Sequence, residues 1–390
     1  MKYKIFSILF LGVAASGYSQ GLLGILPKTA GEQETKPISF TVTAQAGYDS
    51  NLNTTPSNEV DSPFVGGSVG LDYQYVTERT VLSLGVNAGA NYYFDQVEPN
   101  DKTLYNGRLA ATLTQAVTDR LSIDNKAYFG YESEPNYIFG SSLNRRSDEY
   151  LFAYDDFSVN YIWTDRLSTS TSLSVQMIDY DESGASTTED RFVYGARQLV
   201  RYALTDPTAL RAEYRFENTD YDNGNDANRH YALVGLDHAI NENTMFLAMV
   251  GAEFYDSDLA EGTKPYAELG ITRVLSEGLS VRWANRLGYE DVGLGATGYN
   301  SNYTFRTNLD VDYQLSEKLA GHVGASYLYT DYEGDPGDTQ TLAEGRVGLS
   351  YALSAALNLF LNYSYTTLSS DNAANEFDRH RVTVGASMSF

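Results

Sequence analysis

Residues 379–390 read RHRVTVGASMSF, and this stretch alternates apolar and polar side chains to the last residue of the chain. The apolar side chains, separated by basic, small and hydroxyl residues, are Val382, Val384, Ala386, Met388 and Phe390. A period of two places the two sets of side chains on opposite faces of a strand. Where one face contacts lipid, the neighbouring strands must close the sheet, because unpaired backbone groups are costly in hydrocarbon. The stretch therefore predicts a strand of a transmembrane β-barrel.

The chain ends on the aromatic ring of Phe390, directly after this alternation. Such an ending resembles the C-terminal signature that the outer-membrane barrel-assembly machinery reads. We therefore expect Phe390 to act as an assembly signal and the outer membrane to be the destination. The partners that this implies are the assembly machinery, outer-membrane lipid and lipopolysaccharide.

The other end of the chain has the pattern of a secretory signal. Lys2 and Lys4 precede an apolar run, Ile5 to Ala15, and small residues follow. A helix that spans a bilayer needs about 18 or more apolar residues, so this run is too short. The expected divisions are a cleaved signal peptide at 1–19, a periplasmic tail at 20–36 and a transmembrane barrel at 37–390.

The composition excludes several classes of site. The 390 residues contain 32 tyrosines, 33 glycines and no cysteine, with a net charge of −24. Without cysteine there is no disulfide, thiolate nucleophile, thiolate metal site or lipid anchor on an N-terminal cysteine. A nucleic-acid-binding protein usually carries a basic surface, and the net negative charge argues against one here. The chain has only four histidines, which argues against a histidine-rich metal site. We expect no cofactor.

Short polar turns recur at a spacing of roughly 35 to 46 residues, which indicates an array of similar units. Alternating segments of about 10 to 13 residues flank each turn, and a longer connection rich in Asp, Asn and Gly follows. One unit is thus a hairpin with a short periplasmic turn and a longer extracellular loop. The count predicts an antiparallel barrel of about 18 strands, with 16 as the alternative. The turns are Thr77–Arg79, Thr118–Arg120, Thr164–Arg166, Thr205–Pro207, Asn241–Asn243, Ser276–Gly278, Ser316–Lys318 and Ser354–Ala356.

A soluble β-sandwich or β-propeller would also give alternating strands and a period near 40. Aromatic residues favour the membrane barrel. Tyr48 and Tyr131 fall where strands meet long loops, whereas Tyr75 and Trp163 precede short turns. Two interfacial girdles are the natural interpretation.

Some polar residues interrupt faces that should contact lipid. A bulge or a one-residue register error would move such residues to the other face. Elsewhere the faces are apolar, as at Leu82, Leu84 and Val86. The exceptions are Gln115, Asn125, Gln198 and Asn285.

The segment TVTAQAGYDSNLN, residues 41–53, resembles the opening motif of an outer-membrane family described as Putative beta-barrel porin 2. The resemblance implies a porin-like barrel for hydrophilic solutes. It also implies exopolysaccharide export as one role, with polysaccharide export components as partners. No catalytic residues come with it, and the residues Tyr48, Asp49, Ser50 and Asn51 could simply shape the first surface loop.

The water-facing phase of the strands collects arginines and carboxylates, and the guanidinium fork can hold carboxylates, phosphates or sugar hydroxyls. The pore-lining candidates are Arg108, Lys126, Arg197, Arg211, Arg282, Arg286, Arg306, Arg346, Arg379, Arg381, Asp310, Asp312 and Glu344. Two accounts compete for this wall. Mixed-sign pairs could brace the barrel and set a transverse field. Alternatively, an arginine track could guide an acidic polysaccharide or another anion, for which the best candidates are Arg306, Arg346, Arg379 and Arg381.

The longest connection, Ser133 to Glu149, spans about 17 residues, and long ordered loops are usually functional. Folded inward, it would narrow the channel through Phe139, Arg145 and Arg146; folded outward, it would be a surface loop. We expect the constriction. Acidic connections have the oxygen-ligand spacing of a divalent-cation site, but none matches the EF-hand pattern, so solvated loops are favoured.

The favoured function is a passive outer-membrane channel for diffusion or export of hydrophilic solutes. A non-conducting structural or anchoring barrel is one alternative, and a barrel enzyme is another. An enzyme needs a nucleophile or an activated water beside a positioned base. None of His230, His238, His322 and His380 has a Ser or Asp partner at a sequence spacing that supports such a site.

Overall fold

The structure is a computed structural model that describes residues 37–95, 102–132, 149–180, 190–222, 226–276, 278–290, 299–334 and 337–390. The expected signal peptide and tail lie outside these residues, as do the constriction candidates Phe139, Arg145 and Arg146. Within the described part, no helix is both long enough and apolar enough to cross a membrane.

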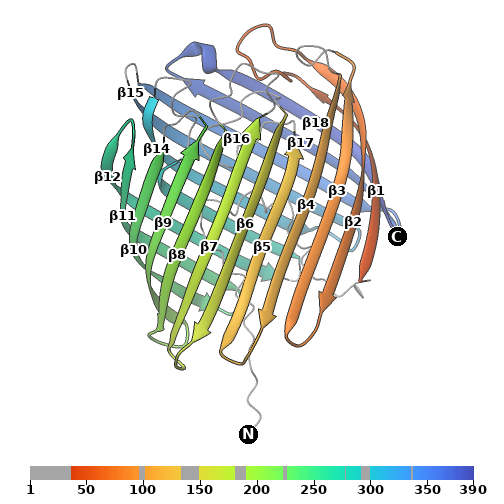
Figure 1. The fold of residues 1–390 in the computed structure, drawn as a ribbon. Coiled ribbons are helices and arrows are strands. Elements are labelled where there is room, and N and C mark those ends of the chain that lie inside the picture. The colour runs from red at the N-terminus through yellow and green to blue at the C-terminus, as the bar shows by residue number, and fades with distance from the viewer. Residues whose placement is uncertain are drawn as a thin grey trace.

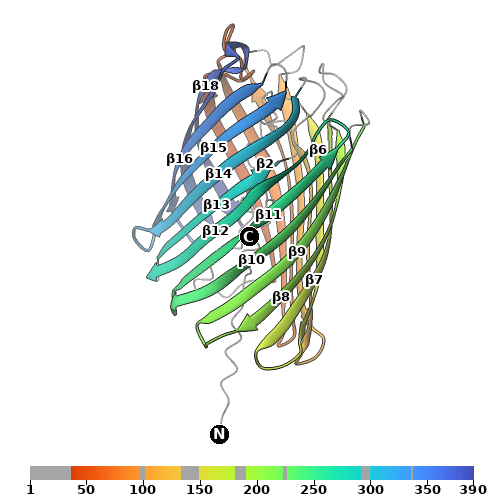
Figure 2. The ribbon, with the colours of Figure 1, turned by 90° about the vertical axis from the view of Figure 1, so that its left-hand side faces the viewer.

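The chain forms one closed antiparallel β-barrel of 18 strands, which confirms the predicted fold and the higher of the two strand counts (Figure 1 and Figure 2). Each strand pairs with its neighbours in the sequence, and β1 pairs with β18 to close the sheet. The strands are β1 (Ile38–Asp49), β2 (Ser62–Val76), β3 (Thr80–Tyr93), β4 (Thr103–Ala116), β5 (Leu121–Glu132), β6 (Tyr150–Ile162), β7 (Leu167–Tyr180), β8 (Arg191–Ala203), β9 (Thr208–Tyr221), β10 (Ala227–Asn241), β11 (Thr244–Ser257), β12 (Glu261–Ser276), β13 (Leu279–Tyr289), β14 (Tyr299–Gln314), β15 (Leu319–Gly334), β16 (Asp338–Ala352), β17 (Leu357–Ser370) and β18 (Phe377–Ser389), with a 3₁₀ turn, η2 (Ala373–Asn375), before the last.

Short turns connect the strands at one end of the barrel, and several share one hydrogen-bond pattern. The hydroxyl of the first residue accepts backbone N–H groups two and three positions later, which suits Ser and Thr to turns. Thr77 Oγ1 accepts from the N–H groups of Arg79 at 3.3 Å and Thr80 at 3.0 Å. Thr118, Thr164, Ser316 and Ser354 repeat the pattern. We call this the turn end and the opposite end, which bears connections such as 50–61 between β1 and β2, the loop end.

The outward face of the barrel is apolar along its strands. Val65, Val69 and Leu71 of β2 are exposed, as are Val382 and Val384 of β18. Exposed apolar side chains on the outer face are expected of a barrel whose outside contacts lipid. The inward face carries the alternate residues of each strand, so the predicted alternation and its phase are confirmed for β18.

Gln115, Asn125 and Gln198 do face outward, and the strand ladder is continuous around each of them. The explanation by a bulge or a register error is therefore wrong. Each side chain has a partner on an adjacent strand: Thr80 Oγ1 donates to Gln115 Oε1 at 2.7 Å, Asn125 Nδ2 to Asp155 Oδ1 at 2.6 Å, and Thr171 Oγ1 to Gln198 Oε1 at 2.7 Å. Asn285 Nδ2, likewise outward, is 3.5 Å from the carbonyl oxygen of Leu269. Such pairing reduces the cost of polar groups on a lipid-facing surface.

Phe390 lies at the seam between the first and last strands. Its backbone N–H donates to the carbonyl of Phe40 at 2.9 Å, and the two rings are 6.2 Å apart. The terminal residue thus extends the ladder that closes the barrel. Its role as an assembly signal stays a prediction.

Candidate functional site: the lumenal wall

Every pore-lining candidate belongs to the inward-facing phase of its strand, opposite in phase to the exposed apolar side chains. On β18, for example, Arg379 and Arg381 alternate with the outward His380 and Val382. The candidates come from strands all around the barrel. The lumen is therefore lined by charge on most sides.

The lumen is packed more densely toward the loop end. Inward side chains there are fully buried, including Tyr93, Tyr231 and Glu253, each at 0% exposure. Toward the turn end, inward Asp72 is exposed and Lys126 is half-buried. Inward side chains of the loop half are therefore less exposed than several of those toward the turn end.

Arg215 is the centre of a buried ion-pair network on β9 and β12. Its Nη2 lies 2.6 Å from Glu213 Oε1, and its Nη1 lies 3.3 Å from Glu268 Oε1. The guanidinium carbon also lies 5.2 Å from the ring centre of Tyr231 and 5.7 Å from that of Tyr266. Carboxylates and aromatic faces thus compensate the charge that burial removes from water.

The same network continues along β8 to β10. Asp237 accepts from Arg201 Nε at 2.9 Å and from Arg211 Nη1 at 3.0 Å. Closer to the loop end, Arg229 Nη2 lies 3.1 Å from Glu217 Oε2. Arg211–Asp237 and Arg229–Glu217 link the neighbouring strands β9 and β10, and Arg201–Asp237 spans β8 to β10, as the bracing account of the wall predicts.

A second set of pairs crosses β13 to β16. Arg306 Nη2 is 2.6 Å from Glu290 Oε2, and Arg286 Nη1 is 3.9 Å from Glu290 Oε1. Arg346 lies 3.4 Å from Asp310 and 3.7 Å from Glu344. Two further candidates pair in the same way, Arg282 with Asp312 at 3.0 Å and Arg108 with Glu132 at 2.9 Å.

His322 also joins this wall. Its Nδ1 lies 2.9 Å from Asp312 Oδ1 and its Nε2 lies 3.7 Å from Asp310 Oδ1. His322 therefore has Asp partners on the neighbouring strand. The sequence spacing concealed the contact, because β14 and β15 bring the side chains together across the ladder.

Asp49 connects the two ends of the barrel sequence. Arg379 Nε donates to both of its carboxylate oxygens, at 2.9 and 3.0 Å, and Arg381 Nε lies 3.8 Å from Oδ2. Asp49 and Asn51 are both 0% exposed. Asn51 Nδ2 donates to the carbonyl of Asp378 at 3.0 Å, across the same seam. The motif therefore does more than shape a surface loop, since it fastens the first strand to the last.

These contacts show whether the four arginines of the proposed track have carboxylate partners. Arg306, Arg346, Arg379 and Arg381 each have a carboxylate within 4.0 Å, so their charges are compensated by the protein itself. These four arginines therefore do not form a row of uncompensated guanidinium groups that could bind an anion. The mixed-sign account describes their arrangement.

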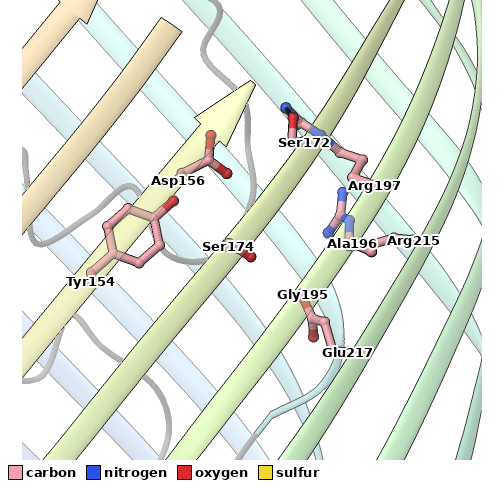
Figure 3. A pocket seen from close by; sticks show the side chains of 9 residues that line it. All are labelled: Tyr154, Asp156, Ser172, Ser174, Gly195, Ala196, Arg197, Arg215 and Glu217. Atoms are coloured by element: carbon pink, nitrogen blue, oxygen red, sulfur yellow. Dashed lines mark hydrogen bonds between the residues drawn. The ribbon is translucent and has the colours of Figure 1, made fainter. Parts of the chain in front are cut away.

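Lys126 and Arg197 differ from the other candidates. Among the described residues, no carboxylate oxygen lies within 4.0 Å of either cation. Arg197 Nη2 donates to Ser172 Oγ at 2.9 Å, and a niche opens beside it in the wall of β6 to β9 (Figure 3). The sequence does not distinguish these two cations from the others, because pairing depends on the register between strands.

The described residues contain no group of three or more His, Asp or Glu side chains arranged to hold a metal ion. The acidic connections considered for divalent cations thus supply no such cluster within the part that the structure covers.

Residues 289–390 match the family model described as Putative beta-barrel porin 2. The resemblance read from the sequence is confirmed for this C-terminal segment, whereas the motif at 41–53 lies outside it. No curated protein matches the chain.

Similar solved structures include a BenF-like porin from Pseudomonas fluorescens Pf-5, with 12% identity over 91% of this chain and 99% of that chain and a TM-score of 0.49. OpdK of Pseudomonas aeruginosa, crystallised with vanillate, has 13% identity over 90% of this chain and 99% of that chain, with a TM-score of 0.46. OccAB4 of Acinetobacter baumannii has 13% identity, 92% and 99% coverage and a TM-score of 0.46. At such low identity and TM-score, these likenesses assign no solute to this chain.

Proposed function

We propose that this chain is a passive, porin-like channel of the outer membrane that admits small hydrophilic solutes. The observation that carries the proposal is the combination of an apolar exterior with a charged and hydroxylated interior in one closed barrel. A polar, water-compatible lumen is what a diffusion channel requires. The match of the last strands to a barrel-porin family supports the same function.

The packed loop half would set the size limit. Solutes entering from the loop end meet buried tyrosines and ion pairs before they reach the turn half, where Asp72 is exposed. Opposite charges along this wall create a transverse field, which orders water and dipolar solutes as they pass. We therefore expect preference for small polar molecules over bulky or apolar ones.

Liposome swelling tests the proposal. Proteoliposomes that contain the purified barrel should swell in isotonic arabinose or glucose. They should swell much more slowly in raffinose, because we expect the packed loop half to exclude the larger sugar. Protein-free liposomes and liposomes with heat-denatured protein are the controls. Swelling no faster than these controls in arabinose would contradict the proposal.

Export of an exopolysaccharide is a finer proposal that rests on the family resemblance. It needs a lumen wide enough for an extended polymer chain. Cells that lack this protein should retain the polymer in the periplasm, while cells with an unrelated porin deleted should not. Unchanged secretion would remove this role and leave general diffusion.

A second candidate function is a non-conducting structural barrel. The fully buried inward side chains of the loop half favour it, since a lumen filled along its whole cross-section would carry no solute. The swelling assay separates the two, because a structural barrel would insert and fold without raising the permeability to arabinose.

The proposed orientation places the turn end in the periplasm. An epitope tag inserted at Asp371–Asn372, in the exposed loop-end connection before β18, should bind antibody on intact cells. A tag at Glu317–Lys318, in an exposed turn, should bind antibody only after the outer membrane is permeabilised. The reverse pattern would show that the barrel is inverted.

A further inference from the structure

We propose that the niche beside Arg197 is a binding site for the carboxylate group of a small hydroxylated solute, with Lys126 as the second cation. The inference rests on the proposed channel function, because the solute reaches the niche through the lumen. It adds a ligand class and a site to that function.

The niche lies in the inward wall of β6 to β9, and it is a shallow recess of about 20 Å³ that opens to the lumen. In Figure 3, Tyr154 and Asp156 lie on one side, and Ser172 and Arg197 lie on the other. Lys126 is directly opposite Asp156 in the pairing of β5 with β6, so it flanks the niche. A recess of this size admits a group little larger than a water molecule, so a carboxylate would enter it while the rest of the solute stays in the lumen.

Arg197 has unused binding capacity. It is directly opposite Arg215 in the ladder between β8 and β9, but only Arg215 has carboxylates in contact. Arg197 makes one hydrogen bond, to Ser172 Oγ, and its buried Nε has no partner. Two adjacent guanidinium groups repel each other, and an anion at Arg197 would relieve that repulsion.

The local charges fit a monovalent anion. The carboxylate of Asp156 interacts electrostatically with both Arg197 and Lys126 but contacts neither closely enough to form an ion pair. The other carboxylate of the niche, Glu217, is already bonded to Arg229 at 3.1 Å and to the hydroxyl of Tyr231 at 3.0 Å. Glu213 also acts on Arg197, but it is paired with Arg215 at 2.6 Å. Asp156, which is hydrogen-bonded to Tyr154, is then the one carboxylate of the described residues without an ion pair beside the two cations, and a single positive charge is left to be matched.

The surrounding groups favour a carboxylate that bears hydroxyl groups. A guanidinium fork matches the geometry of a carboxylate with two parallel hydrogen bonds. The hydroxyls of Ser172 and Ser174 line the same niche, and Asp156 can accept hydrogen bonds from solute hydroxyls. Asp156 also disfavours a phosphate dianion, since like charges repel. Sugar acids have this combination of groups.

The test is current block in a planar bilayer, with glucuronate as the probe at low salt. Addition of glucuronate to the wild-type channel should reduce the ion current, while glucose should not. In R197Q and in K126Q the half-blocking concentration should rise about tenfold, the size expected for loss of one charge-assisted hydrogen bond. R282Q, which removes another lumenal cation that is paired with Asp312, is the matched control and should leave the half-blocking concentration nearly unchanged.

Each other outcome counts against the site. An equal rise in R282Q would show general attraction by lumenal charge, and equal block by inorganic phosphate would remove the preference for a carboxylate. A wild-type channel that conducts but is not blocked would refute the site and leave the channel function intact. A wild-type protein that conducts nothing would instead refute the channel function. Unchanged gel mobility of the unheated variants would show that they are folded.

Discussion

Replacing Asp49 with alanine should lower the free energy of unfolding of the barrel by about 3 to 5 kcal/mol, because the change leaves a buried arginine without its carboxylate. Arg379 donates to both oxygens of Asp49, and both side chains are buried. Arg381 would lose the same partner. Since these contacts join β1 to β18, the loss falls on the one pairing that closes the sheet.

The measurement is urea unfolding of the barrel in lipid vesicles, followed by the fluorescence of its two tryptophans. D61A is the matched control, because Asp61 is exposed in the connection after β1 and accepts one hydrogen bond from Tyr48 at 2.8 Å. The control should unfold close to the wild type. Equal midpoints for D49A and D61A would show that the seam does not depend on Asp49.

Replacing Arg215 with alanine is expected to have an effect of similar size, about 3 to 5 kcal/mol, because Glu213 and Glu268 would remain buried and lose their cation. R215K keeps the charge but not the planar fork, and it should recover only part of the loss. R201A is the control from the same wall, since Arg201 is partly exposed and shares Asp237 with Arg211.

Urea unfolding in vesicles also measures this prediction. The order of stability should be wild type and R201A, then R215K, then R215A. If R215A were as stable as R201A, the network on β9 and β12 would be too well hydrated for its burial to matter.

The sequence predicted those features of the fold that depend on local patterns. Alternation in residues 379–390 gave the strand and its inward phase, and hydroxyl residues such as Thr77 and Ser354 marked the turns. Both signals act between residues a few positions apart, since side chains alternate along a strand and turn hydroxyls bond nearby N–H groups. The strand count followed from the repetition of these signals.

Pairing across strands could not be read in the same way. Asp49 and Arg379 are adjacent only because the barrel closes, and His322 meets Asp312 only in the register of β14 with β15. Arg197 and Arg215 resemble each other in the sequence, yet one is nearly unpaired and the other has two carboxylates. A change of one residue in register would exchange these partners, so their identity needs the folded sheet.

Ion conductance of the purified wild-type barrel in a planar lipid bilayer tests the channel function most directly. Insertion should produce discrete current steps that are linear in voltage and grow with KCl concentration, because a water-filled lumen conducts as an electrolyte. Protein that is folded, as shown by faster gel mobility before heating than after, and inserted in the bilayer, yet gives no current steps, would contradict the account and identify the barrel as a closed structural element.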